Sequence, residues 1–149
     1  MNFLIGFITA IIAGAAMSIQ GVFNTALGEK IGLFETNAFV QGTAFVLSVI
    51  VAFIWGRGDM SQLAHTNPLY MTGGLFAVLI TATVMVAMKN LNPALAVSVI
   101  LIAQLAVAAL IDALGVFGVE KTPFTWNKYV GIAVMIAGVI LFKMSFKKG

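Results

Sequence analysis

The sequence predicts an all-α membrane protein with five transmembrane helices. The chain of 149 residues is 61% hydrophobic and only 9% charged, with a mean hydropathy of +1.08. Soluble domains are nearer half apolar and a quarter charged. Because roughly a third of the unfolded surface stays exposed after folding, a soluble chain of this size could not hide so much apolar surface. The composition therefore excludes a soluble enzyme, a disordered protein and a nucleic-acid binder.

Five long apolar runs give the elements that we expect. Each is close to the length of about 20 residues that a helix needs to cross a bilayer. Strands of a membrane β-barrel would be about 10 residues long with alternating polarity, and these runs are too long and too uniform for that. We expect residues 1–149 to form a single five-helix transmembrane domain. The expected helices cover residues 2–27, 37–55, 70–88, 94–114 and 129–146.

Capping residues suggest where these helices begin and end. Gly28 follows the first run and suits a left-handed C-terminal cap. Asn-Pro pairs precede the third and fourth runs, as expected for an N-cap followed by proline in the first turn. The candidate N-caps of the second, third and fourth helices are Thr36 or Asn37, Asn67 and Asn92.

The distribution of basic residues barely specifies an orientation. Five spans place the two termini on opposite sides of the membrane, and we name the amino-terminal side "side A" and the other "side B". Three Lys/Arg residues then fall on side A and five on side B, a small bias for placing side B in the cytoplasm. Three of those five lie in the last seven residues. Side A holds Arg57, Lys121 and Lys128, and side B holds Lys30, Lys89, Lys143, Lys147 and Lys148.

The aromatic residues favour an inverted pair of subunits. All Trp and Tyr residues of the chain lie near side A, namely Trp55, Tyr70, Trp126 and Tyr129. Such residues usually mark both membrane interfaces, and two copies in opposite orientations would supply both belts. We therefore expect an antiparallel homodimer with dual topology. The alternative is a monomer or parallel dimer in which phenylalanines serve side B: Phe23, Phe34 and Phe146.

Neutral amides inside the spans are the candidate solute ligands. Gln20 and Asn24 lie four residues apart, on one face of the first helix. Gln41 lies in the second helix and Gln104 near the middle of the fourth. Polar side chains are costly in hydrocarbon and mark interiors or pathways. Amides can hydrogen-bond a neutral solute or join helices, and for Gln20 and Asn24 both interpretations stay open.

Two further features of the spans concern packing and coupling. Gly14, Ser18 and Gly21 form a seam of small residues that predicts close helix packing. Asp112 is the one carboxylate inside an expected span. It could titrate and couple export to protons, or bind a cation, or anchor a helix end at the interface.

Inversion of one subunit would combine these features. Gln20 and Asn24 lie in the side B half of the first helix, whereas Asp112 lies in the side A half of the fourth. They are far apart within one subunit. In an antiparallel dimer, the amides of one copy would reach the level of the partner's carboxylate and form two symmetry-related polar sites.

The first helix resembles a known family. Its segment Gln20-Gly21-Val22-Phe23-Asn24-Thr25-Ala26-Leu27-Gly28 is similar to the Q-x-x-x-N-x-x-L-G signature of the YdcZ-like five-helix family in the drug/metabolite transporter superfamily. Gly73-Gly74, the stretch from Ala94 through Gln104 and Asp112 to Gly115, and residues 131–141 fit as well. The resemblance implies a bacterial or archaeal inner-membrane protein, in a family that includes dual-topology members. The related small multidrug exporters carry a glutamate in the first helix, whereas this chain has Gln20 there.

The sequence as a whole favours a small secondary transporter, an exporter of a small organic solute that works by alternating access in an inverted dimer. A channel-like pore and a non-transporting membrane assembly or regulatory subunit are the alternatives. One His and no Cys make a transition-metal site unexpected, and no set of catalytic groups occurs together. We expect no cofactor and no nucleic-acid partner. The expected partners are the lipid bilayer, the solute and a second copy of the chain.

Overall fold

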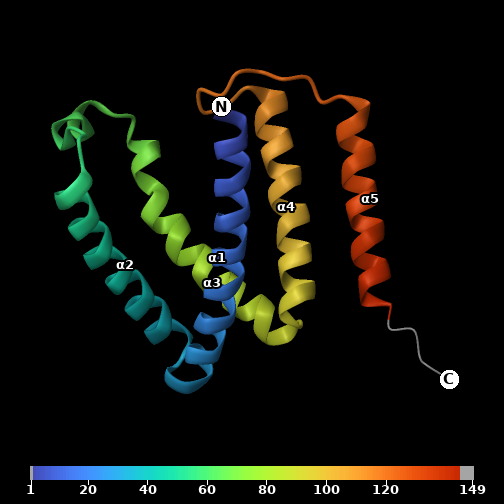
Figure 1. Cartoon of the computed structure of the whole chain (residues 1–149), viewed down its shortest axis with the longest axis horizontal. Coiled ribbons are helices and arrows are strands. Elements are labelled where there is room, and N and C mark those ends of the chain that lie inside the picture. Colours follow the sequence, from blue (N-terminus) through green and yellow to red (C-terminus); the bar gives the residue numbers. More distant parts are fainter. Residues whose placement is uncertain (1, 145–149) are drawn as a thin grey trace. The chain divides into compact units, whose positions relative to one another are not determined.

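The chain folds into helices that are long and apolar enough to span a membrane (Figure 1). The computed structural model describes residues 2–144, and side chains from residue 3 onward. The third candidate span, Pro68–Asn90, joins the short 3₁₀ helix η2 to α3. The expected all-α architecture with five apolar helices is therefore confirmed for the described residues. The helices are α1 (Asn2–Ile31), α2 (Leu33–Trp55), η1 (Met60–His65), η2 (Pro68–Thr72), α3 (Gly73–Asn90), α4 (Pro93–Leu114) and α5 (Trp126–Lys143).

The junction between α1 and α2 differs from the expected one. Gly28 lies inside α1, so its interpretation as a left-handed cap was wrong. The helix continues until Gly32, whose φ of 102° only glycine adopts easily. The N–H of Gly32 donates to the carbonyl oxygen of Gly28 at 3.0 Å, and α2 starts at the next residue. Thr36 and Asn37 consequently lie within α2 rather than at its N-cap, and both are buried.

The starts of the later helices lie close to the positions that the sequence predicts. The Asn92 side chain accepts a hydrogen bond from the Leu95 N–H at 2.9 Å, which confirms it as the N-cap of α4. Asn67 accepts from the Leu69 N–H at 3.0 Å, although the helix that it caps is η2. The fifth helix starts at Trp126, three residues earlier than expected. Residues 145 and 146 of its expected range lie outside the described residues.

The loop between α2 and α3 is ordered by Asp59, the N-cap of η1. Its carboxylate accepts hydrogen bonds from the hydroxyl of Ser61 at 2.7 Å, the backbone N–H of Ser61 at 2.9 Å and the amide of Gln62 at 3.3 Å. These hydrogen bonds, the Ser61 hydroxyl above all, hold the pKa of Asp59 below its usual value. The carboxylate is fully exposed, so its role is local to this loop.

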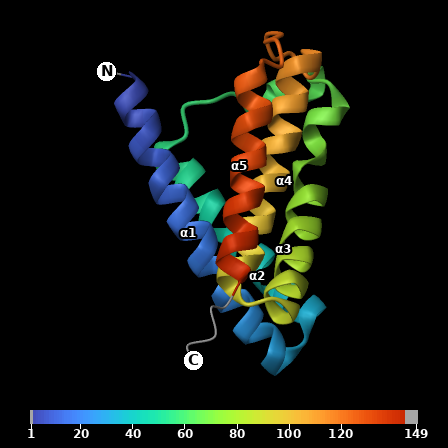
Figure 2. The same cartoon turned by 90° about the vertical axis from the view of Figure 1, so that its right-hand side faces the viewer.

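The chain divides into two compact units, residues 1–90 and 91–149. In the first unit, α1, α2 and α3 pack against one another. In the second unit, α4 and α5 lie side by side, as Figures 1 and 2 both show. The chain from Gly115, a left-handed C-cap, to the start of α5 joins these two helices.

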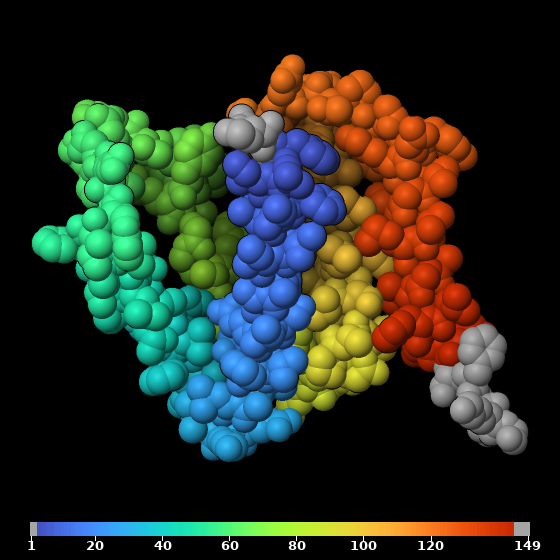
Figure 3. All heavy atoms as spheres, viewed as in Figure 1, coloured from blue at the N-terminus to red at the C-terminus, as the bar shows by residue number. Residues whose placement is uncertain are grey.

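The buried part of the first unit lies where α1 ends, α2 begins and α3 ends. Its buried residues are Gly21, Asn24, Thr36, Asn37, Met85 and Met88. Away from this junction, apolar side chains are exposed, as at Phe3 (86%) and Phe53 (92%). Figure 3 shows the α1 side chains, in blue, uncovered along the face of this unit that the view presents. In a bilayer such surfaces contact lipid tails or another helix at little cost.

Candidate functional site

Close packing of α1 against α3 depends on two glycines of α1. A methyl group at Gly21 would lie 2.5 Å from the Cε of Met88 and 3.3 Å from the Cγ1 of Val84. A methyl group at Gly28 would collide with the Cε of Met85. Asn24 lies between these glycines at helical spacing, so the same face of α1 carries it into the interior, where it is 8% exposed.

Two amides of α2 join this helix to α3. The Nδ2 of Asn37 donates to the carbonyl oxygen of Val78 at 2.8 Å, and the Nε2 of Gln41 donates to the Oγ1 of Thr81 at 3.1 Å. The donors are four residues apart on α2, so they lie on one face. Hydrogen bonds of this kind between membrane helices contribute about 0.6–2 kcal/mol each.

Two buried acceptors at the junction have no partner within the described part of the chain. These are the Oγ1 of Thr36, in a residue that is 0% exposed, and the Oδ1 of Asn37, in a residue that is 4% exposed. A buried polar atom left without a hydrogen bond costs about 1–3 kcal/mol. We name Asn24, Thr36, Asn37, Gln41 and Thr81 the junction cluster. Its chemistry is neutral, with amide and hydroxyl groups only.

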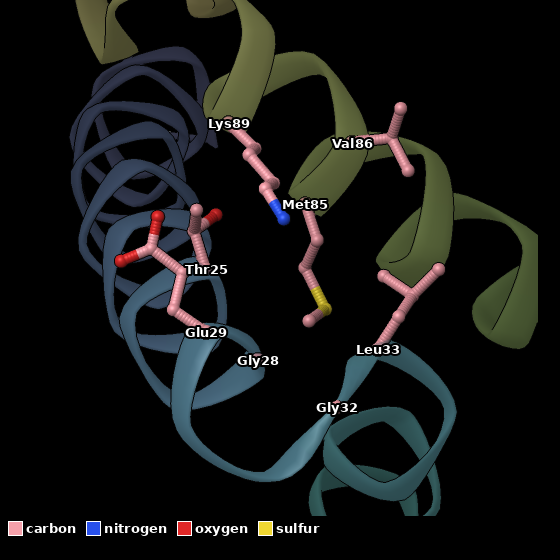
Figure 4. A pocket seen from close by; sticks show the side chains of 8 residues that line it. All are labelled: Thr25, Gly28, Glu29, Gly32, Leu33, Met85, Val86 and Lys89. Carbon is pink, nitrogen blue, oxygen red and sulfur yellow. The ribbon is translucent and has the colours of Figure 1, made fainter.

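A pocket opens beside the junction cluster, at the ends of α1 and α3 (Figure 4). Its volume is about 280 Å³. It is lined by Thr25, Gly28, Glu29, Gly32, Leu33, Met85, Val86 and Lys89. Gly28 lines the pocket and also lies near the junction cluster, because a methyl group at Gly28 would lie 3.7 Å from the Oγ1 of Thr36.

The structure brings together only some of the amides that the sequence singled out. Asn24 is buried and Gln41 half-buried in the first unit, whereas Gln20, one turn before Asn24, is exposed. Gln104 is exposed on α4 of the second unit. Of the packing seam, Gly21 meets α3, but a methyl group at Gly14 would have no atom within 4 Å. The hydroxyl of Ser18 donates to the carbonyl oxygen of Gly14 in its own helix, at 3.0 Å.

Asp112 lies at the end of α4 with a basic partner. Its carboxylate is 3.8 Å from the Nζ of Lys128, and its side chain is 44% exposed. Its backbone carbonyl oxygen accepts from the N–H of Thr122 at 2.8 Å. The expectation that Asp112 is the one carboxylate within a span was wrong. The first two candidate spans also contain Glu29 and Glu35, because α1 is longer and α2 starts earlier than expected.

Sequence patterns do not predict several of the residues that line the site. The sequence predicts Thr36 and Asn37 only as helix caps, although Asn37 precedes Gln41 by four residues, which is also the spacing of Gln20 and Asn24. The sequence predicts Lys89 only as a cation of side B, and no pattern singles out Glu29. Sixty residues separate them in the sequence, so only the fold brings them to one pocket.

Comparison with known proteins gives a family for this arrangement. The model of the family described as "Putative inner membrane exporter, YdcZ" matches residues 5–141, which includes most of each candidate span. No curated protein and no solved structure matches the chain. The match confirms the resemblance that the first helix indicated, and with it an inner-membrane location. This five-helix chain belongs to the YdcZ family of the inner membrane, a family described as exporters.

Proposed function

We propose that the protein is a secondary transporter that exports a small organic solute by alternating access, as an antiparallel homodimer. The observation that carries this proposal is the pair of buried acceptors on Thr36 and Asn37, which have no partner within the described residues. Unpaired polar groups inside a membrane protein are expensive and mark pathways by default. A solute that donates hydrogen bonds would satisfy both atoms.

The solute site that we propose centres on the junction cluster. Asn24 and Gln41 contribute further amide groups to it, and Gln20 extends it by one turn along α1. Gln104, on α4 of the second unit, remains a separate proposed solute ligand. The lining is neutral at its centre, which suits a small solute with hydrogen-bonding groups in a mostly apolar surrounding.

The antiparallel dimer is supported by the placement of the aromatic residues. Trp55 ends α2 and Tyr70 lies in η2, so both fall at the α2–α3 end of the first unit. Trp126 and Tyr129 lie at the start of α5. Inverted repeats let the two halves of a transporter exchange conformations around a site at the midplane, and an inverted dimer provides this symmetry from one chain.

Dual topology has a direct test. A phosphatase and a fluorescent protein are each fused after Gly149. The phosphatase is active only outside the cytoplasm and the fluorescent protein fluoresces only inside it, so we expect a signal from both fusions. Both signals should appear in comparable amounts because the charge bias is so small. Signal from only one of the two fusions would contradict dual topology. Adding three lysines to the loop between α2 and α3 should shift both populations to one orientation, which serves as the control.

Asp112 is our proposed coupling residue. We expect Asp112→Asn to abolish proton-driven accumulation of the solute in inverted vesicles while exchange of solute for solute continues. The reason is that an amide cannot carry a proton through the cycle. Lys128→Gln is the matched control, because it removes the ion pair and leaves the carboxyl group. Intact accumulation in the Asp112→Asn variant would limit Asp112 to its contact with Lys128 at the helix end.

One observation favours a second function, that of a non-transporting assembly subunit. Asn37 and Gln41 already bond α2 to α3, as polar groups that only hold helices together would do. A thermal-shift screen of metabolites separates the two functions, since a ligand that binds the folded state raises its melting temperature.

The screen uses Gln20→Ala as its specificity variant, because Gln20 is exposed and its loss should leave the packing intact. We expect a solute that stabilises the wild-type protein and not this variant. Thr9→Ala is the control on the same helix, as the Thr9 hydroxyl donates only to carbonyl oxygens of its own helix. If no metabolite in the screen raises the melting temperature, the function of an assembly subunit is the better explanation.

A further inference from the structure

The pocket at the ends of α1 and α3 carries two opposite charges on separate helices. Glu29 comes from α1 and Lys89 from α3, with Met85 on the wall one turn before Lys89. Figure 4 shows the Lys89 side chain reaching from α3 toward α1, with Glu29 and Thr25 on the α1 wall. The pocket lies wholly within the first unit.

The two charges do not neutralise each other. Within the described residues, an ion pair with nitrogen and oxygen 4.0 Å apart or less joins Lys128 to Asp112, and none joins Glu29 to Lys89. Both side chains are exposed, so neither is held by surrounding protein. A pocket with an unpaired anion and an unpaired cation on opposite walls is complementary to a ligand that carries both charges.

The remaining lining defines the rest of such a ligand. The hydroxyl of Thr25 donates to the carbonyl oxygen of Gly21 at 2.8 Å, so its oxygen is left to accept a hydrogen bond beside Glu29. Leu33, Met85 and Val86 are apolar. The volume of about 280 Å³ is slightly below the range of about 300–1,000 Å³ that is typical of ligand pockets. Only a small ligand with a short aliphatic body fits this description.

We propose that this pocket binds a small aliphatic zwitterion, a compound of the α-amino-acid type. Its ammonium group pairs with the carboxylate of Glu29 and the oxygen of Thr25, and its carboxylate pairs with the ammonium of Lys89. The inference rests on the proposed function and names its substrate class. Met85 lines this pocket, and a methyl group at Gly28 would come close to both the Cε of Met85 and the Oγ1 of Thr36. The pocket is therefore the outer subsite of the junction cluster.

The first test uses the wild-type protein alone. Calorimetric titration of the detergent-purified protein compares L-leucine with 3-methylbutylamine, which lacks the carboxylate, and with 4-methylpentanoate, which lacks the ammonium. We expect L-leucine to bind at least about tenfold more tightly than either, the effect of one charge-assisted contact. Equal binding of a singly charged analogue, or no binding of L-leucine, would overturn the proposal.

The second test assigns each charge to its residue. Glu29→Gln should weaken L-leucine binding at least about tenfold and leave 4-methylpentanoate unaffected, and Lys89→Gln should weaken L-leucine and leave 3-methylbutylamine unaffected. Lys30→Gln is the control, because Lys30 lies in the last turn of the same helix but does not line the pocket. Unchanged L-leucine binding in both pocket variants would refute the site. The analogue that each variant should still bind shows that it is folded.

Binding and transport can fail separately in these experiments. L-leucine binding that depends on both charges, without any flux, would support the pocket and refute the exporter. Saturable export of another solute, without L-leucine binding, would refute the zwitterion site and leave the exporter in place.

Discussion

Replacing Gly21 with leucine should strongly destabilise the first unit, because it places a bulky side chain where α1 packs against α3. The Cβ alone would lie 2.5 Å from the Cε and 2.8 Å from the Sδ of Met88. Met88 is only 5% exposed, so its side chain has little room to retreat. Overpacking of a filled interior costs about 1–3 kcal/mol and occasionally more, and the added isobutyl group extends beyond the Cβ. The free energy of unfolding in mixed detergent micelles measures the loss.

Gly6→Leu is the matched control for this prediction. It makes the same change on the same helix at a position where an added methyl group would have no atom within 4 Å. We expect its free energy of unfolding to stay within about 0.5 kcal/mol of the wild-type value, as for other exposed substitutions. Equal destabilisation by both variants would mean that contact between α1 and α3 does not set the cost, since leucine has a higher helix propensity than glycine at either position.

Replacing Thr36 with valine should stabilise the protein and impair its export. Valine has nearly the shape of threonine and removes the buried hydroxyl that has no partner in the described chain. Because that unpaired group costs about 1–3 kcal/mol, the free energy of unfolding should rise by about 1 kcal/mol. If the hydroxyl binds the solute, the same variant should lose at least about tenfold in export at low solute concentration.

Thr43→Val provides the comparison on α2. The Thr43 hydroxyl donates to the carbonyl oxygens of Phe39 and Val40 at 3.0 Å and is exposed. We expect this variant to export normally. A Thr36→Val protein that is more stable and fully active would show that the unpaired hydroxyl is a packing compromise without a role in transport.

Helix ends at the α1–α2 junction show what local sequence signals can and cannot predict. Glycine suits both a left-handed cap and a close approach of two helices, and nothing local distinguishes these uses at Gly28. Gly28 is helical, and the side chain of Met85 on α3 leaves no room for a Cβ at this position. Asn92 was predictable because its cap involves only its own next turn.

The candidate site was predictable to the extent that it follows one helix face. The spacing of Gln20 and Asn24 predicted a polar face on α1, and Asn24 is indeed buried. The partner of Asn37 is a backbone carbonyl oxygen on α3, and every residue of a helix offers that group, so no sequence pattern marks it. That Glu29 and Lys89 line one pocket likewise depends on the packing of α1 against α3.

Solute counterflow in proteoliposomes tests the central claim most directly, with the solute identified by the thermal-shift screen. An alternating-access exporter preloaded with unlabelled solute should take up labelled solute transiently above equilibrium, with saturation, and Thr36→Val should reduce the initial rate at least about tenfold. Flux that neither saturates nor shows counterflow would indicate a channel and contradict this account. Counterflow that is equally fast in the Thr36→Val protein would place the solute site away from the junction of α1, α2 and α3.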